Sequence, residues 1–145
     1  MDKRNRCFFI GHRDAPESVY PALCRAVENH IAEHGVTEFV VGRYGNFDSM
    51  AARAVTEAKI RHPDVTLTVL LPYHPSGAKE KVPAGFDASW YPPGMETVPA
   101  RAAIVRAVWY AVDHSAYVIA CVRHPGSNAQ KFTEYARKKT AVTLL

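Results

Sequence analysis

Three short segments of the chain combine glycine with side chains that bind anions. Each follows an apolar run and precedes a stretch with helical periodicity. Free N–H groups and the positive dipole end at a helix start favour an anion, commonly a phosphate. The segments are Gly11-His12-Arg13, Gly42-Arg43-Tyr44-Gly45-Asn46 and Gly126-Ser127-Asn128. The glycine in any one of these turns is equally well explained by the need for a tight backbone turn. The prediction of a small-anion site therefore depends on the three turns lying close together.

Several arginines accompany these turns. Arg13, Arg43 and Arg123 lie in the turns or next to them, and Arg101 lies early in a predicted helix, with Arg106 about one turn further along. Guanidinium groups form charge-assisted hydrogen bonds with anionic ligands. We therefore expect Arg101 to point toward the same site and Arg106 to lie deeper.

The elements that must position these residues alternate between strands and helices. Short apolar runs predict strands, and apolar residues three or four positions apart predict helices. The predicted strands are Cys7–Ile10, Glu38–Val41, Val65–Leu71, Tyr117–Val122 and Ala141–Leu145, and the predicted helices are 18–34, 46–62, 97–113 and 128–139, with Thr97 capping the third. Such alternation is typical of an α/β fold. We expect one Rossmann-like domain over 1–145, with a five-stranded parallel sheet in the order 3-2-1-4-5 and helices on both faces.

One long segment, 72–98, shows no periodicity. Prolines and glycines interrupt it throughout. We expect a functional loop or lid there, or else disorder, because structureless loops of this length are otherwise uncommon.

The expected fold places the three turns together. In open parallel sheets, ligands bind beyond the carboxyl ends of the strands, where the strand order reverses. Here that point lies between the first and fourth strands. Residues that directly follow each strand therefore converge on one edge, and a small anionic ligand is the predicted partner.

Composition and missing motifs exclude several alternatives. The 145 residues are 48% hydrophobic and carry a net charge of +4, with charge spread along the chain, which argues against a nucleic-acid partner. There is no G-x-G-x-x-G, P-loop or G-x-S-x-G motif, and no cofactor motif. His30 and His34 are four residues apart, as two metal ligands on a helix can be, but they lack the adjacent glutamate of H-E-x-x-H, so no metal is expected. No apolar run is long enough to span a membrane. The chain has three cysteines and no CxxC pair, which is typical of a cytoplasmic protein whose thiols are reduced.

The sequence also resembles a known superfamily. Phe8-Phe9-Ile10-Gly11-His12-Arg13 resembles the "FTGHR" opening of SLOG proteins, named for SMF/DprA and LOG. The segment from Val41 to Asp48 is similar to the "GxxGxFD" turn of the YpsA-related branch. The segments from Arg101 to Tyr110 and from Ser115 to Ile119 resemble its "R…RN.WM…SDYVI" pattern, and Pro125 to Ala129 takes the place of the second glycine-rich turn. The resemblance covers nearly the whole chain.

This resemblance implies a nucleotide or nucleotide-derived ligand and, more weakly, a homodimer. LOG enzymes cleave the N-glycosidic bond of a nucleoside 5′-monophosphate, and Arg106 matches their arginine by its place before the fourth strand. Their glutamate position is Thr133 here, with Glu134 one residue later. Asp48 is an alternative carboxylate for ribose hydroxyls or positive charge, or it stabilises a helix start. Two main functions therefore stay open: a ligand-binding or sensing module, and a phosphoribohydrolase using Arg106 with Asp48 or Glu134. DNA binding by analogy with DprA is a third.

Overall fold

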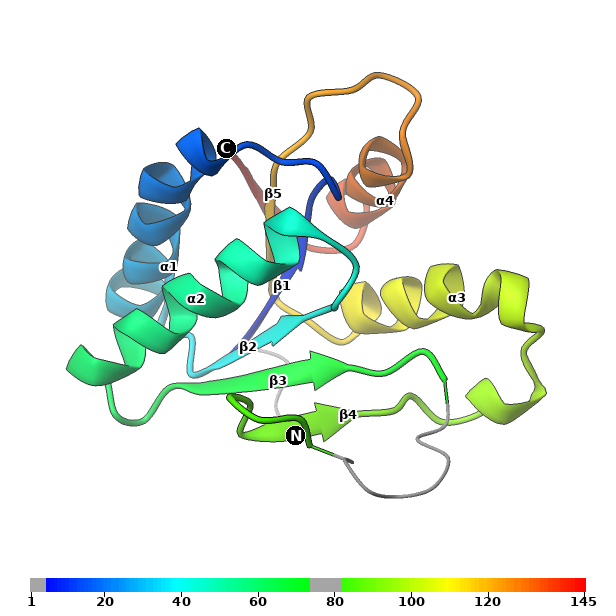
Figure 1. Cartoon of the computed structure of the whole chain (residues 1–145), viewed down its shortest axis with the longest axis horizontal. Coiled ribbons are helices and arrows are strands. Elements are labelled where there is room, and N and C mark those ends of the chain that lie inside the picture. Colours follow the sequence, from blue (N-terminus) through cyan, green and yellow to red (C-terminus); the bar gives the residue numbers. More distant parts are fainter. Residues whose placement is uncertain (1–4, 74–81) are drawn as a thin grey trace.

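Six parallel strands form a single sheet in the order β4-β3-β2-β1-β5-β6 (Figure 1). The computed structural model describes residues 5–73 and 82–145. The strands are β1 (Arg6–Ile10), β2 (Glu38–Val41), β3 (Thr66–Leu70), β4 (Ala88–Trp90), β5 (Tyr117–Ala120) and β6 (Ala141–Leu144). The predicted α/β class and the order of the five predicted strands are confirmed.

Helices cover both faces of the sheet (Figure 1). They are α1 (Tyr20–His34), α2 (Asn46–Arg61), α3 (Ala100–Asp113) and α4 (Asn128–Arg137), with short 3-10 helices η2 (Glu17–Val19) and η3 (Met95–Thr97). Helices α1 and α2 pack on one face, and α3 and α4 on the other, each pair over its own apolar cluster.

Strand β1 explains why the sheet is buried on both sides. All five of its residues are buried. Successive side chains of a strand point to opposite faces, so Phe9 joins the cluster under α1 and α2 while Phe8 joins the cluster under α3 and α4. A strand covered on both faces is continuously apolar, as this one is between Cys7 and Ile10.

The prediction of five strands is wrong by one. The sixth strand, β4, lies within the segment 72–98 that we expected to be structureless, and it pairs with β3 at the sheet edge. It has only three residues, all half-buried, which is too short for a periodic pattern to show. Part of the expected loop, 74–81, lies outside the described residues. The remainder is ordered by η3 and by hydrogen bonds such as that from Leu71 N to Trp90 O.

The start of α3 also differs from the prediction. Thr97 ends η3 instead of capping the long helix, which begins at Ala100 after Pro99. The residue before a proline is pushed toward extended backbone, and Val98 adopts φ −86° and ψ 129°. The helix therefore starts on the far side of this proline. Among the described helices, none is long and apolar enough to cross a membrane.

Candidate functional site

A cavity of about 230 Å³ lies at the carboxyl edge of the sheet, where the strand order reverses at β1. Its floor is apolar, with Ile104 and Val108 from α3 and Phe132 from α4. Its polar lining comes from the three predicted turns and the helices that follow them: Gly11, His12, Arg13, Gly42, Tyr44, Gly45, Asp48 and Asn128. The predicted convergence of the loops after β1, β2 and β5 is therefore present.

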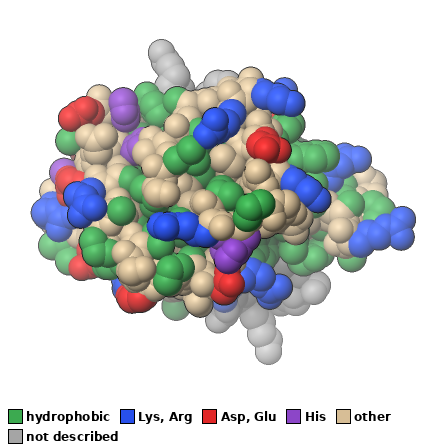
Figure 2. Space-filling view, turned by 90° about the horizontal axis from the view of Figure 1, so that it is seen from above, with side chains coloured by type: hydrophobic (Ala, Val, Ile, Leu, Met, Phe, Trp, Pro, Cys, Tyr) green, Lys and Arg blue, Asp and Glu red, His purple; other side chains and the backbone are tan. Residues whose placement is uncertain are grey.

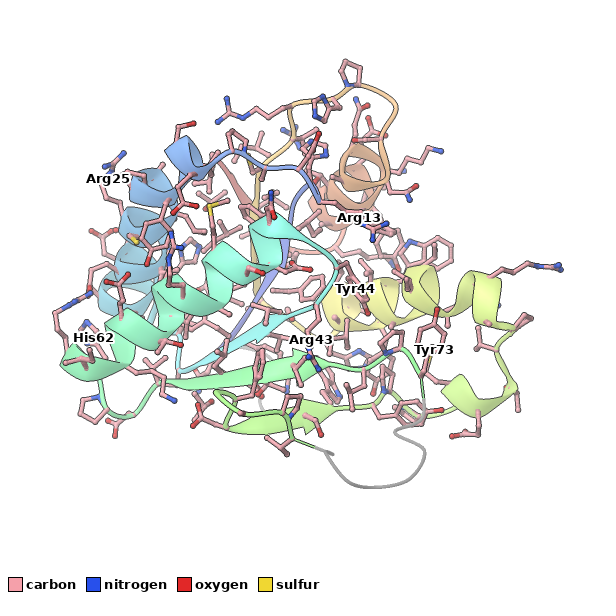
Figure 3. The ribbon with its side chains drawn as sticks, viewed as in Figure 1. Arg13, Arg25, Arg43, Tyr44, His62 and Tyr73 are labelled. Carbon is pink, nitrogen blue, oxygen red and sulfur yellow. The ribbon has the colours of Figure 1, made fainter. Side chains whose placement is uncertain are left out.

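The mouth of this region carries cationic and aromatic side chains. Figure 3 shows Arg13, Arg43, Tyr44 and Tyr73 on the side of the molecule where β1, β2 and β3 end. Arg25 and His62 lie at the left of that view, on α1 and just beyond the end of α2. Arg13 and Arg43 are exposed. On the face shown in Figure 2, Lys and Arg side chains are scattered among acidic and apolar ones and do not gather in one continuous patch.

Asp48, in the first turn of α2, places a carboxyl group at the cavity. Its Oδ2 atom accepts a hydrogen bond from the backbone N–H of Tyr44 at 3.1 Å, and the described residues supply no other partner. Burial raises the pKa of Asp48 to about 6, and the Tyr44 N–H only partly offsets this effect. The carboxyl group is thus mostly ionised at pH 7 although few donors surround it.

The Tyr44 side chain lies beside Asp48 and lines the same cavity. Its hydroxyl oxygen is buried and has no hydrogen-bond partner among the described residues. Burial and the nearby Asp48 raise the pKa of this phenol, so it stays protonated. The sequence pattern placed Tyr44 in the turn after the second strand but predicted no role for its side chain. The available signal was a tyrosine between two glycines directly after a predicted strand.

The glycines of these turns permit close packing. A Cβ atom on Gly42 would lie 2.5 Å from the Tyr44 ring and 3.0 Å from Oδ2 of Asp48. A Cβ atom on Gly11 would lie 2.1 Å from the Phe47 ring, and one on Gly45 would lie 2.3 Å from the Cα atom of Arg13. These contacts explain why the turns contain glycine without invoking a phosphate.

The N-terminus of α2 is already occupied by the loop that follows β1. The backbone N–H of Asn46 donates to the carbonyl of Arg13 at 2.9 Å, and that of Phe47 donates to the carbonyl of His12 at 3.3 Å. Two amides that an anion would use are therefore satisfied within the chain. This helix contributes Asp48 to the site.

The N-terminus of α4 is different because two of its amides are unused. Ser127 caps the helix, its Oγ atom accepting from Gln130 N at 3.2 Å, while the Gln130 side chain accepts from Gly126 N. The backbone N–H groups of Asn128 and Ala129 have no acceptor among the described residues, and both residues line the cavity. Of the two helix starts at this cavity, α4 is the one prepared for an anion.

His12 joins the loop after β1 to the loop after β5. Its Nε2 atom accepts backbone hydrogen bonds from Arg123 at 2.8 Å and His124 at 3.3 Å. Two donors on Nε2 require that this nitrogen be unprotonated, so the neutral ring carries its proton on Nδ1. Burial lowers the pKa of His12, and the nearby His124 lowers it further.

This tautomer argues against a metal at the neighbouring side chains. His12, Asp14 and His124 place ligand atoms within 4.8 Å of one another. However, Nε2 of His12 is engaged by two amides and Nδ1 carries the proton. The other two side chains are largely exposed. We assign no metal to this cluster.

The remaining predicted residues lie away from the cavity lining. Arg101, Arg106 and Glu134 are all exposed, and none lines the cavity. Thr133, at the glutamate position of the resembled motif, is buried, and its hydroxyl donates to Ala129 O at 2.7 Å. One residue further along a helix is a rotation of about 100°, which accounts for the different exposure of Glu134. The structure brings Asp48 to the cavity but neither Arg106 nor Glu134.

Comparison with known proteins gives no family assignment. No protein-family model matches the chain, and no curated protein matches it.

Proposed function

We propose that this chain binds a nucleotide or a nucleotide-derived small ligand at the carboxyl edge of its sheet. One observation supports this proposal most directly. A single cavity is lined by an under-paired carboxyl group, Asp48, and by two unused helix amides, those of Asn128 and Ala129. A ligand that fits must carry an anionic group for the amides and hydrogen-bond donors for the carboxylate.

A nucleoside phosphate has both features. Its phosphate suits the start of α4, which carries the positive end of the helix dipole. Its sugar and base carry neutral donors, and an apolar floor suits the face of a ring. The cavity is smaller than the roughly 300–1,000 Å³ of typical ligand sites, so it would enclose part of a nucleotide and leave the rest at the mouth.

The alternative, a phosphoribohydrolase, has less support. Its proposed arginine and glutamate, Arg106 and Glu134, are exposed and lie outside the cavity lining. Among the described residues that line the cavity, Asp48 alone provides a carboxylate. Binding without turnover therefore fits the geometry better. The resemblance to SLOG proteins also supports the proposal of a homodimer, which sedimentation analysis tests. The proposal of a cytoplasmic location rests on the three free cysteines without a CxxC pair, and cell fractionation tests it.

The amide of Asn128 offers a sharp test of ligand binding. Proline is tolerated at the first position of a helix, where it removes only an N–H that has no partner within the helix. The preceding residue, Ser127, is already extended (φ −75°, ψ 165°), as a residue before proline prefers. Asn128→Pro therefore deletes one proposed phosphate donor, while Asn128→Ala keeps that donor and removes the side chain.

Native mass spectrometry with a panel of nucleoside monophosphates and nucleotide sugars would identify a retained ligand. Calorimetry would then compare the variants. We expect Asn128→Pro to weaken binding by about 10-fold or more, as for a lost hydrogen bond to a charged group, and Asn128→Ala to have a smaller effect. No retention of any panel member, or equal affinity in both variants, would contradict the proposal. Free base released in the same samples would instead support the hydrolase.

A further inference from the structure

The segment that leads into α4 is joined to the loop after β1 by one side chain. This segment, residues 121–127, connects β5 to α4 and is the orange loop of Figure 1. Beyond its first residue, the described chain gives it two hydrogen bonds to the loop after β1, and both end on His12. The backbone N–H groups of Arg123 and His124 donate to Nε2 of this ring at 2.8 and 3.3 Å.

The same segment determines where the start of α4 lies. The two unused amides, those of Asn128 and Ala129, follow it directly, and both residues line the cavity together with His12. Hydrogen bonds weaken steeply when donor and acceptor are misaligned. A shift of the segment would therefore turn these donors away from a bound anion.

The two hydrogen bonds exist only while His12 is neutral. Both need the lone pair on Nε2, and a protonated imidazole has a donor on each nitrogen. Protonation would place an N–H group against two backbone N–H groups, so the segment would have to move away. Burial and the nearby His124 lower the pKa of His12, which agrees with a neutral ring in the folded chain.

Other charged groups act on the same ring. The described titratable groups that line the cavity with His12 or act on its charge are Arg13, Asp14, Tyr44, Asp48, Arg123 and His124. His124, whose ring centroid lies 4.5 Å away, and Arg123 oppose a positive charge on His12, whereas Asp14 favours one. The contact of His124 with Asp14, at 3.5 Å, joins two exposed side chains, so it holds the segment only weakly.

We propose that His12 is a positioning residue of the ligand site: its neutral ring holds the segment before α4 in place, and its protonation releases the segment and weakens anion binding. This inference rests on the proposed function because it concerns regulation of the same site. A ligand that needs the held segment selects neutral His12, so its affinity falls as pH falls. Simple attraction between an anion and a protonated histidine predicts the opposite sign.

The test uses an anion that does not itself titrate. A phosphate monoester changes charge near pH 6, whereas sulfate keeps its double charge from pH 5 to pH 8. The amide signals of Asn128 and Ala129 in ¹⁵N–¹H spectra report sulfate binding to the full chain at pH 7.5 and pH 5.0, at constant ionic strength. The four ribonucleoside monophosphates are further probes at pH 7.5.

Three variants separate the acceptor from the charge. His12→Gln offers an uncharged amide oxygen as acceptor and does not titrate, and His12→Phe offers no acceptor. His34→Gln is the control, because His34 is an exposed histidine at the end of α1 and outside the cavity lining. Asp48 titrates in the same pH range but is present in every variant, so the ratio of two affinities removes its effect.

We expect the sulfate affinity of the unaltered protein, relative to that of His12→Gln, to fall by about 5-fold or more from pH 7.5 to pH 5.0. His34→Gln should follow the unaltered protein. His12→Phe should bind sulfate about 5-fold or more weakly than the unaltered protein already at pH 7.5. Without ligand, hydrogen-exchange protection factors of the Arg123 and His124 amides should fall at pH 5.0 in the unaltered protein and not in His12→Gln.

The outcomes separate this inference from the proposed function. Sulfate binding at pH 7.5 with a constant or rising affinity ratio at pH 5.0 would overturn the role of His12 and leave anion binding intact. Unchanged protection of the Arg123 and His124 amides would overturn it as well. If neither sulfate nor any nucleotide shifted the signals of Asn128 and Ala129, the proposed function and this inference would fail together.

Discussion

Nε2 of His12 accepts a hydrogen bond from the backbone N–H of Arg123 at 2.8 Å, and this bond joins the loops after β1 and β5 beside the cavity. Because the N–H of His124 points at the same nitrogen, removing the ring leaves two backbone donors without this acceptor. We predict that His12→Phe lowers the free energy of unfolding at pH 7.5 by about 1–3 kcal/mol. Urea unfolding measures the loss. His34→Phe, which removes an exposed histidine, should cost less.

The His12 contact should also depend on pH. Its pKa is lowered in the folded chain, so below the ordinary value near 6.5 the unfolded chain binds more protons and stability falls. We expect the difference between the unaltered protein and His12→Phe to shrink from pH 7.5 to pH 5. Long-range ¹⁵N–¹H spectra should show the proton on Nδ1 of His12 at pH 7.5. A proton on Nε2 would contradict the assigned hydrogen bonds.

Protonation of Asp48 should raise the stability of the fold, whereas protonation of His12 lowers it. Its pKa rises from an ordinary value of 3.8 to about 6, so the folded chain binds more protons between these values. The ionised group is therefore destabilising at neutral pH, and this penalty disappears as pH falls through the same window. We predict that Asp48→Asn stabilises the protein by about 1–3 kcal/mol at pH 7.5 and by almost nothing at pH 3.8. Thermal unfolding at both pH values, with Asp64→Asn as the control, measures the effect. Destabilisation at pH 7.5 would contradict it.

The turn at Gly45 was predictable from the sequence as a turn, but its physical role was not. Strand order and the site edge follow from apolar runs such as Cys7–Ile10 and from the glycines after them. By contrast, the carbonyl of Arg13 that occupies the start of α2 depends on tertiary contact between distant loops. The exposure of Arg106 depends on helix rotation against the sheet. The spacing of residues in the sequence predicts neither the position of the Arg13 carbonyl nor the exposure of Arg106.

The glycines test this distinction between packing and ligand contact. A Cβ atom on Gly45 meets the Arg13 backbone, which cannot rotate away, whereas a Cβ atom on Gly11 meets the Phe47 side chain. We predict that Gly45→Ala and Gly11→Ala each destabilise the fold by about 1–3 kcal/mol. Adding Phe47→Ala, which removes the Cγ and Cδ2 atoms at 2.1 and 2.2 Å from that Cβ, should offset part of the loss for Gly11→Ala and none for Gly45→Ala, each compared with Phe47→Ala alone. Urea unfolding of these five variants decides this. Equal rescue of both would contradict the assigned contacts.

Arg6 and Glu38 form an ion pair at the end of the sheet opposite to the cavity. We expect the effects of replacing these two residues on stability to be strongly coupled. The side chains are 2% and 13% exposed, and Arg6 Nε donates to Glu38 Oε1 at 2.8 Å. Trp90 and the carbonyl of His114 contact the same guanidinium, while Thr68 donates to the other oxygen of Glu38 at 3.0 Å. Removing one charge leaves the other buried without its partner, which costs about 3–5 kcal/mol.

We therefore predict that Glu38→Leu destabilises the protein by about 3–5 kcal/mol. The double variant Arg6→Leu/Glu38→Leu should be much closer to the unaltered protein, because the double replacement leaves no buried charge. Its remaining costs are the Thr68 hydroxyl, which loses an acceptor, and the His114 carbonyl, which loses a donor, each worth about 1 kcal/mol. A double-mutant cycle by urea unfolding measures the coupling. Additive losses in the cycle would mean that the two charges are hydrated independently, contrary to the burial of Arg6.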